Sequence, residues 1–210
     1  MSDVASDRRS IVFLAIAVEG GLVVLAVILG WLLDQQPFDQ FRWDAADAGV
    51  GLAATLPMLA LFFAMLRWPV GPLRHIKKFS EEVLRPLLAP CTVIDLLGIS
   101  ALAGIGEEML FRGVLQGYFT GRLGPWPALA LASLLFGLMH AITATYAVLA
   151  ALLGFYLGWI YLASGNNLLA VTLPHALYDF VALLYLLRGS GSTTGRVTKT
   201  DPEIGTKNAD

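Results

Sequence analysis

The sequence predicts an all-α integral membrane protein, a bundle of about six transmembrane helices plus an interfacial amphipathic helix. The first observation is composition, because 57% of the 210 residues are hydrophobic and 14% are charged, whereas soluble domains are about 25% charged. The second is a mean hydropathy of +0.69. The third is a series of apolar runs close to the roughly 20 residues that cross a bilayer as a helix.

Composition also narrows the classes of partner and site. A net charge of −2 gives no sign of nucleic-acid binding. Cys91 is the single cysteine, which excludes an intramolecular disulfide and a structural zinc site built on paired cysteines. The 21 glycines suit close helix packing in lipid. We therefore expect membrane lipid as a partner and no nucleic acid, while nothing in the sequence indicates an oligomeric state.

The first two predicted spans, residues 11–33 and 48–68, flank an acidic loop. A cleaved signal peptide is the rival interpretation of the first run. Its apolar core would be shorter, about 7–15 residues, so the run predicts a retained span. Glu19 interrupts it, either as a partner within the bundle or as a tolerated polar residue beside two glycines.

A basic stretch after the second span sets the expected orientation. Its apolar residues recur at helical spacing over residues 73–88, which predicts an amphipathic helix lying in the interface. The basic residues are Arg67, Arg74, Lys77, Lys78 and Arg85. Lys and Arg mark the cytoplasmic side, so both termini are expected in the cytoplasm. Docking of lipid or substrate is the alternative role for these charges.

Four further spans are predicted at residues 90–119, 125–143, 146–162 and 168–187. The glycines of the first of them predict an irregular point near residues 104–106. Asp95 lies earlier in that span, where it either supports a site or caps a helix. We expect three units: 1–88 with two spans and the interfacial helix, 89–187 as the catalytic membrane core, and 188–210 as a disordered polar tail.

Ionisable side chains inside these apolar runs identify a candidate site. Each costs roughly 2.5–3.5 kcal/mol at membrane depth on insertion scales, so by default they signal function. Glu108 and Arg112 are four residues apart and share a helix face, so they can pair. Glu107 points about 100° away from Glu108. We expect it to face two histidines from separate spans, His140 and His175.

Two mechanisms use these residue types, and both hydrolyse a carbonyl substrate with activated water. In the first, Glu107, His140 and His175 bind a divalent metal, with zinc as the best candidate, and the metal activates its bound water. In the second, no metal takes part. Glu107 is the general base for a water that His140 also holds, and His175 helps to stabilise the tetrahedral oxyanion. The sequence lacks the soluble zincin motif His-Glu-x-x-His, so a metal would need ligands from separate helices.

Three short motifs resemble those of one known family. They are Glu107-Glu108-x-x-x-Arg112, Phe136-x-x-x-His140 and His175-x-x-x-Asp179. In this order they resemble the motifs of the CPBP family, also called the Abi family, which comprises type II CAAX prenyl endopeptidases and bacteriocin-processing or immunity proteins. The resemblance covers about residues 89–187. It implies a helical intramembrane protease with its active site in a polar cavity, acting on a peptide or protein substrate.

The resemblance also implies roles for single residues. Glu107 is similar to the water-activating glutamate of the family, and His140 to its partner in holding the water. Glu108 and Arg112 resemble supporting residues. The family is described both as metalloproteases and as glutamate-dependent hydrolases, so both mechanisms stay open. A small chain of this kind also resembles prokaryotic members, so we expect a bacterial inner membrane, where prenylated CAAX substrates are not expected.

Position 179 departs from the prenyl proteases, which have Asn there. Together with His175, Asp179 resembles the oxyanion-side pair of the family. An ionised Asp cannot donate a hydrogen bond to an oxyanion, whereas Asn can. Asp179 therefore fits as an orienter of His175, as a metal ligand or as a protonated donor. This departure weakens the transfer of CAAX specificity more than the transfer of hydrolysis.

Two other classes of function compete with a protease. A bacteriocin-immunity or ligand-binding membrane protein of the same fold would keep the site without turnover. A small transporter would also place Glu and His in its spans, but the internal repeats typical of transporters are missing from this sequence. Loss of peptide cleavage in a folded Glu107→Ala variant would identify the protease, whereas loss of ion or solute flux would identify the transporter.

Overall fold

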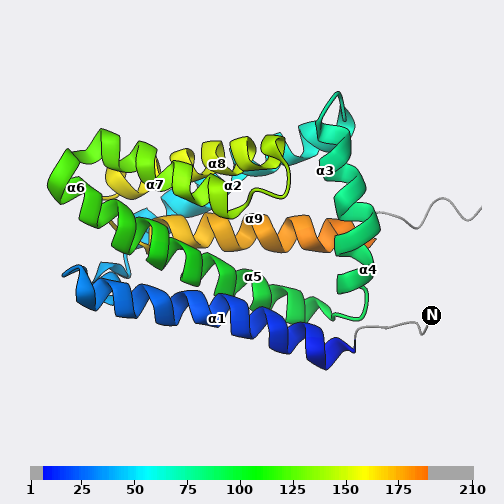
Figure 1. The fold of residues 1–210 in the computed structure, drawn as a ribbon, viewed down its shortest axis with the longest axis horizontal. Helices are drawn as coiled ribbons and strands as arrows, with labels where there is room; N and C mark the ends of the chain where they lie inside the picture. Colours follow the sequence, from blue (N-terminus) through cyan, green and yellow to red (C-terminus); the bar gives the residue numbers. More distant parts are fainter. Residues whose placement is uncertain (1–6, 189–210) are drawn as a thin grey trace, which may run out of the picture.

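The structure, a computed structural model, describes residues 7–188, which form helices and turns with no strand in that range (Figure 1). The longer helices are α1 (Arg8–Leu32), α2 (Ala45–Arg67), α5 (Val93–Glu108), α7 (Pro125–Met139), α8 (Ala144–Ala163) and α9 (Leu169–Arg188). The shorter elements are η1 (Pro37–Gln40), α3 (Leu73–Phe79), η2 (Ser80–Leu84), α4 (Arg85–Leu88), η3 (Met109–Gln116) and α6 (Gly117–Leu123). The all-α class is confirmed, while the predicted disordered tail lies, after Arg188, outside the described residues.

Helix α9 is the centre of the bundle. It packs along α5 and α2, and it touches α8 more lightly. Helix α1 covers α5, and α7 pairs with α8. Figure 1 shows α3 and α4 standing crosswise against one end of the bundle, where the predicted interfacial helix lies. This arrangement places the three predicted motif segments, on α5, α7 and α9, around one interior.

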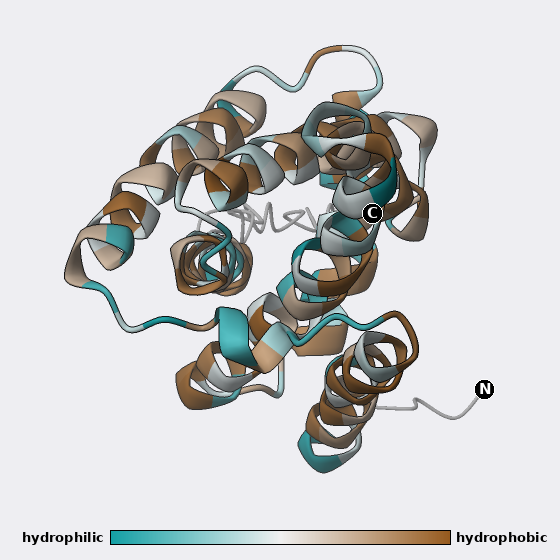
Figure 2. Ribbon diagram, turned by 90° about the vertical axis from the view of Figure 1, so that its left-hand side faces the viewer, coloured by the Kyte–Doolittle hydropathy of each residue, from teal (hydrophilic) through white to brown (hydrophobic). Residues whose placement is uncertain are grey.

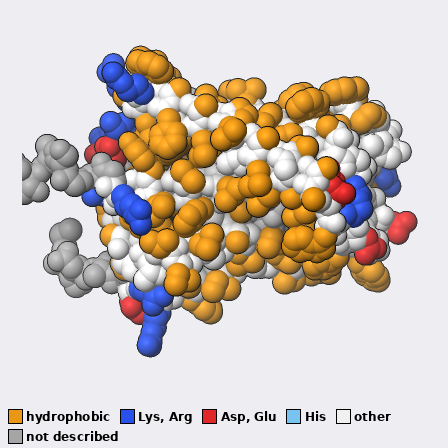
Figure 3. Space-filling model, turned by 180° about the vertical axis from the view of Figure 1, so that it is seen from behind, with side chains coloured by type: hydrophobic (Ala, Val, Ile, Leu, Met, Phe, Trp, Pro, Cys, Tyr) orange, Lys and Arg blue, Asp and Glu red, His pale blue; other side chains and the backbone are white. Residues whose placement is uncertain are grey.

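Apolar side chains cover the outside of the bundle as well as its interior. Figure 2 shows hydrophobic residues all around the helices, with hydrophilic residues gathered in the segments that connect them. In Figure 3 hydrophobic side chains cover the flank, and Lys and Arg gather at one end. A soluble protein of this size would not expose such a flank, so the described residues form a membrane protein.

The number of spans differs from the six predicted. Four helices are long and apolar enough to cross a membrane, namely Arg8–Leu32, Ala45–Arg67, Ala144–Ala163 and Leu169–Arg188. The segments Leu73–Leu88 and Val93–Leu123, bent by 116°, raise the number to five if they count as one span. Helix α7 is apolar but has 15 residues, fewer than the roughly 20 that a bilayer requires. The described residues therefore support four or five spans by length and composition.

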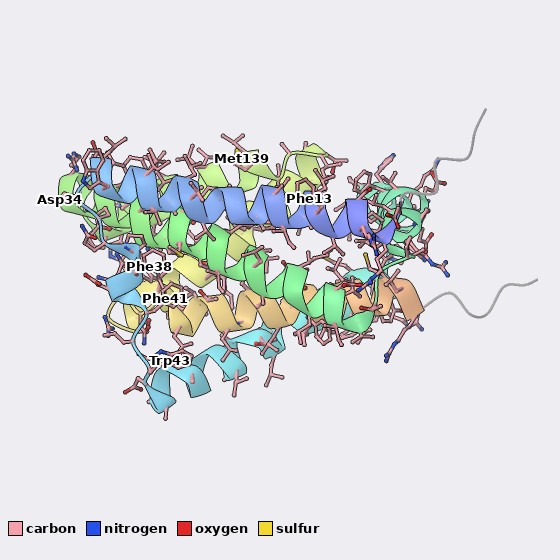
Figure 4. All side chains as sticks on the ribbon, turned by 90° about the horizontal axis from the view of Figure 1, so that it is seen from below. Phe13, Asp34, Phe38, Phe41, Trp43 and Met139 are labelled. Atoms are coloured by element: carbon pink, nitrogen blue, oxygen red, sulfur yellow. The ribbon has the colours of Figure 1, made fainter. Side chains whose placement is uncertain are left out.

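Aromatic residues mark the end of the bundle opposite the basic one. Figure 4 shows Phe38, Phe41 and Trp43 near Asp34 at this end. Trp43 is 92% exposed and Phe38 is 59% exposed. Trp and Tyr are enriched at the membrane–water interface because their rings are amphipathic, and Trp43 fits this pattern. Their position is consistent with a bundle whose two ends lie in the two interfaces.

Asp95 belongs to a helix cap, which is one of its two predicted roles. The Thr92 side chain accepts a hydrogen bond from the Asp95 N–H, and the Asp95 carboxylate accepts one from the Thr92 N–H, which is a capping box. The same carboxylate pairs with the Arg8 guanidinium at 2.6 and 2.7 Å. It therefore joins the start of α1 to the start of α5, far from the motif residues along the helix.

The irregular point predicted near residues 104–106 is wrong, because α5 runs through it without a break. The glycines serve close packing instead: a Cβ on Gly106 would lie 2.7 Å from the carbonyl oxygen of Glu19 on α1. The irregularity follows the carboxylates, where Met109–Gln116 form a π-helix. Such segments are rare and are frequently found at functional sites.

We predict that Gly137→Ala destabilises the bundle because α7 and α8 approach closely at this position. A Cβ there would lie 2.5 Å from the carbonyl oxygen of Ala147 and 2.7 Å from the Cβ of Ala151. Overpacking of this kind costs about 1–3 kcal/mol in free energy of unfolding. Gly98→Ala is the control, since no atom lies within 4 Å of its new Cβ. Thermal unfolding in detergent measures both, and equal midpoints would contradict the prediction.

Candidate active site

The two adjacent carboxylates lie at the end of α5, directly before the π-helix. Glu108 has no exposed surface, and the Glu107 side chain is 12% exposed. Because the two residues are consecutive on a helix, their side chains leave it in different directions. Glu108 points to Arg112 and Glu107 points to the histidines, as the sequence spacing predicted.

Arg112 joins three segments around the site. One guanidinium nitrogen donates to Oε1 of Glu108 at 3.0 Å, and another donates to the carbonyl oxygen of Gly154 on α8 at 2.9 Å. The guanidinium carbon also lies 4.6 Å from the ring centroid of Phe136 on α7, which is a cation–π contact. Arg112 is 1% exposed, so these contacts replace water as the partners of its charge.

His175 is oriented by Glu108 rather than by Asp179. Its Nδ1 lies 2.6 Å from Oε1 of Glu108, the same oxygen that Arg112 binds. A carboxylate paired with arginine is ionised and only accepts hydrogen bonds, so Nδ1 carries the proton and donates. The Nε2 of His175 is left to face the cavity side, where Oδ2 of Asp179 lies at 3.5 Å.

His140 is oriented by the main chain of its own helix. Helix α7 ends at Met139, so His140 occupies the C-cap rather than the interior of a span running to residue 143. Its Nδ1 lies 2.8 Å from the carbonyl oxygen of Phe136, and a carbonyl can only accept, so Nδ1 donates. The ring packs over Phe136 with centroids 4.5 Å apart. As in His175, Nε2 is the free nitrogen.

Both free nitrogens face one carboxylate oxygen. Oε2 of Glu107 lies 3.7 Å from Nε2 of His140 and 3.7 Å from Nε2 of His175. This oxygen is buried and has no hydrogen-bond partner among the described residues. With each histidine in the neutral form protonated on Nδ1, three acceptor atoms face one another and require a donor or a cation between them. A water, which has two protons, meets this requirement.

A metal ion would meet the same chemical requirement, but the distances are too long for it. Two ligands of a tetrahedral zinc bound at 2.0–2.1 Å lie about 3.3 Å apart, less than the 3.7 Å between Glu107 and each histidine. No group of three His, Cys, Asp or Glu side chains within residues 7–188 is placed to hold a metal ion. As placed, the residues do not fit zinc, and the metal stays a prediction.

These side chains line a cavity of about 140 Å³. Glu107, His140, His175 and Asp179 form its polar side. The remaining wall is mostly apolar and comes from α2 (Met58, Leu61, Met65), α7 (Phe136) and α8 (Leu149, Ala150, Leu153, Leu157). Helix α2 lies outside the predicted catalytic core of residues 89–187. No sequence motif in α2 indicated that it lines the cavity.

Two tyrosines line the same cavity, Tyr146 on α8 and Tyr178 on α9. No sequence motif indicated them, because a tyrosine in an apolar helix is ordinarily a packing residue. Position 178 lies next to a motif residue and could have been noticed, whereas Tyr146 lies outside all three motifs. On α1, the oxygen Oε2 of Glu19 is buried without a hydrogen-bond partner among the described residues.

Comparison with known proteins points to the family that the motifs resemble. Residues 89–181 match the family described as Type II CAAX prenyl endopeptidase Rce1-like. This segment is similar to that family. The match confirms the resemblance over slightly less than half of the chain and includes every residue of the three motifs. Comparisons with curated proteins and with solved structures gave no match.

We predict that Arg112→Ala strongly destabilises the Rce1-like segment. The substitution leaves the Glu108 carboxylate buried without its counter-ion, and breaking a buried pair costs about 3–5 kcal/mol. Lys77→Ala is the control, because Lys77 and Glu81 are 3.9 Å apart and both about half exposed, and such pairs contribute roughly 0–1 kcal/mol. Chemical denaturation in detergent measures both. An Arg112→Ala variant as stable as Lys77→Ala would refute a supporting role for the buried pair.

Proposed function

We propose that this protein is an intramembrane endopeptidase that hydrolyses a peptide bond with a water activated by Glu107. The observation that carries the proposal is the convergence of Nε2 of His140 and Nε2 of His175 on Oε2 of Glu107, an oxygen with no hydrogen-bond partner within residues 7–188. A pair of oriented histidines beside a free carboxylate is an arrangement suited to general-base catalysis. The match to an endopeptidase family supports the same reaction.

The proposed reaction begins with a water held between Glu107 and the two histidines. Glu107 takes a proton from this water, and the water oxygen attacks the carbonyl carbon of the peptide bond. A tetrahedral intermediate forms with a negative charge on the former carbonyl oxygen. Glu107 then returns its proton to the leaving nitrogen as the C–N bond breaks. One peptide and one water give one carboxylic acid and one amine.

His175 and Asp179 complete the polar side of the proposed site. Glu108 fixes the ring of His175 through Nδ1, so Nε2 is aimed at the water and the reacting carbonyl. Asp179 lies 3.5 Å from that nitrogen and adds a further carboxylate to the polar side. In this proposal the apolar wall receives hydrophobic side chains of the substrate, and a membrane-resident peptide or protein segment is the substrate class.

The membrane arrangement in this proposal has six crossings. They are α1, α2, the segment Val93–Leu123, α7, α8 and α9. The end with the crosswise helix, Arg67 and Arg188 is cytoplasmic, because Lys and Arg favour that side. A bacterial inner membrane is the proposed location.

We predict that Glu107→Gln abolishes cleavage while the protein stays folded. The amide has nearly the shape of the carboxylate but cannot accept a proton from water, and loss of a general base costs typically 10²–10⁴-fold in rate. His140→Ala and His175→Ala are expected to abolish cleavage as well. The assay is cleavage of a fluorogenic peptide library by the purified protein in lipid nanodiscs.

Asp95→Ala is the control for these variants, since it removes a carboxylate of α5 that belongs to the helix cap. It is expected to retain cleavage with a lower unfolding temperature. Full activity in Glu107→Gln would refute the proposed function. A wild-type protein that cleaves no peptide of the library or of its own membrane fraction would favour a binding protein of the same fold.

We predict that cleavage persists after removal of divalent metals. The 3.7 Å separations between Glu107 and the histidines suit a bound water better than zinc, whose ligands are closer together. Metal analysis of the purified protein before and after chelation, with His175→Ala as a comparison, provides the measurement. One zinc per chain, lost together with activity in the chelated protein and absent from His175→Ala, would show that the metal route operates.

A further inference from the structure

The proposed reaction needs a hydrogen-bond donor that the motif residues do not supply. The developing oxyanion is normally stabilised by preorganised donors about 2.7–3.1 Å away. Nδ1 of His175 donates to Glu108, and Nδ1 of His140 donates to the carbonyl oxygen of Phe136. Asp179 lies near Nε2 of His175, and an ionised Asp only accepts. The cavity therefore has an excess of acceptors among its motif residues.

Tyr146 supplies a donor in the same cavity. It lines the cavity together with Glu107, His140 and His175. Its ring lies edge-on to the ring of His140, with centroids 6.1 Å apart and an interplanar angle of 63°. Its hydroxyl forms no hydrogen bond within residues 7–188, although a phenolic O–H donates readily. This hydroxyl is free to bind a substrate atom.

We propose that the hydroxyl of Tyr146 is the oxyanion donor of the proposed reaction. The inference rests on the proposed function. When the water oxygen bonds to the carbonyl carbon, the π electron pair moves onto the carbonyl oxygen, and the Tyr146 O–H donates a hydrogen bond to it. The proton stays on the tyrosine. When the C–N bond breaks, the carbonyl double bond forms again and the hydrogen bond weakens.

The position of Tyr146 in its helix suits this role. It lies in the first turn of α8, a helix of 20 residues whose N-cap is Thr143. The partial positive charge at a helix N-terminus favours negative charge nearby. The backbone N–H of Tyr146 already donates to Oγ1 of Thr143 at 3.1 Å. The side-chain hydroxyl, rather than this N–H, is therefore the group left for the substrate.

Tyr178 is the matched comparison for Tyr146. It lines the same cavity and has the same hydroxyl. Its ring packs edge-on against Phe62 on α2, with centroids 6.0 Å apart, whereas Tyr146 packs against the histidine proposed to hold the water. Tyr146 is thus the tyrosine whose ring contacts His140, whereas the ring of Tyr178 contacts α2.

Tyr146→Phe tests the inference, because it removes one oxygen atom and keeps the ring that shapes the cavity. We expect kcat to fall roughly 10²-fold, the typical loss on removing one oxyanion donor, with KM changed less than about twofold, since the bond forms only in the transition state. A peptide phosphinate, whose tetrahedral oxyanion resembles the intermediate, is expected to lose affinity by a similar factor. Tyr185→Phe, at a partly exposed position outside the cavity, is expected to match the wild type.

Three results would overturn the inference. One is an unchanged kcat in Tyr146→Phe, another is a loss confined to KM, and the third is a larger loss of kcat in Tyr178→Phe than in Tyr146→Phe. Glu107→Gln, assayed in parallel, separates this inference from the proposed function. If Glu107→Gln keeps full activity, the proposed function fails. If Glu107→Gln is inactive and Tyr146→Phe keeps its kcat, the hydrolysis stands and the role of Tyr146 fails.

Discussion

Glu108 and Arg112 form an ion pair with almost no exposed surface, and the geometry of the site depends on it. Two charges so deeply buried are stable only if each has partners. Arg112 finds them in Glu108, the Gly154 carbonyl and the Phe136 ring, so the pair joins α5, α7 and α8. The Oε1 atom of Glu108 also holds His175 on α9. One carboxylate oxygen thus positions a side chain on the central helix.

The chemistry follows from how this network uses up hydrogen-bond donors. Both histidines have their Nδ1 protons committed to fixed acceptors, which leaves two Nε2 atoms and one Glu107 oxygen facing an interior space. Such a set of acceptors is costly to bury unless a donor lies between them. The site therefore favours a bound water. In the proposed reaction the oxyanion needs a hydrogen-bond donor, and these acceptor atoms do not provide one.

The scaffold around the site relies on close contact rather than on exclusion of water, because lipid is as apolar as the helix surfaces. Glycines permit that contact, as at Gly106 against α1 and Gly154 beside Arg112. At the aromatic end, Asn167 adds a polar tie: its side chain donates to the Arg42 carbonyl at 2.9 Å and to Asp47 at 2.7 Å. The turn before α9 is thereby fixed to the start of α2, and both helices line the cavity.

The sequence by itself determined the all-α membrane class and the pairing of Glu108 with Arg112, because composition and helix periodicity are local properties. It also indicated that Glu107, His140 and His175 would meet, since buried ionisable groups need partners. Only the tertiary structure decided that Glu108 rather than Asp179 holds His175, that the irregular segment follows the carboxylates, and that Tyr146 shares their cavity. Such contacts depend on the rotation and depth of one helix against another, and residue spacing within a single helix does not encode them.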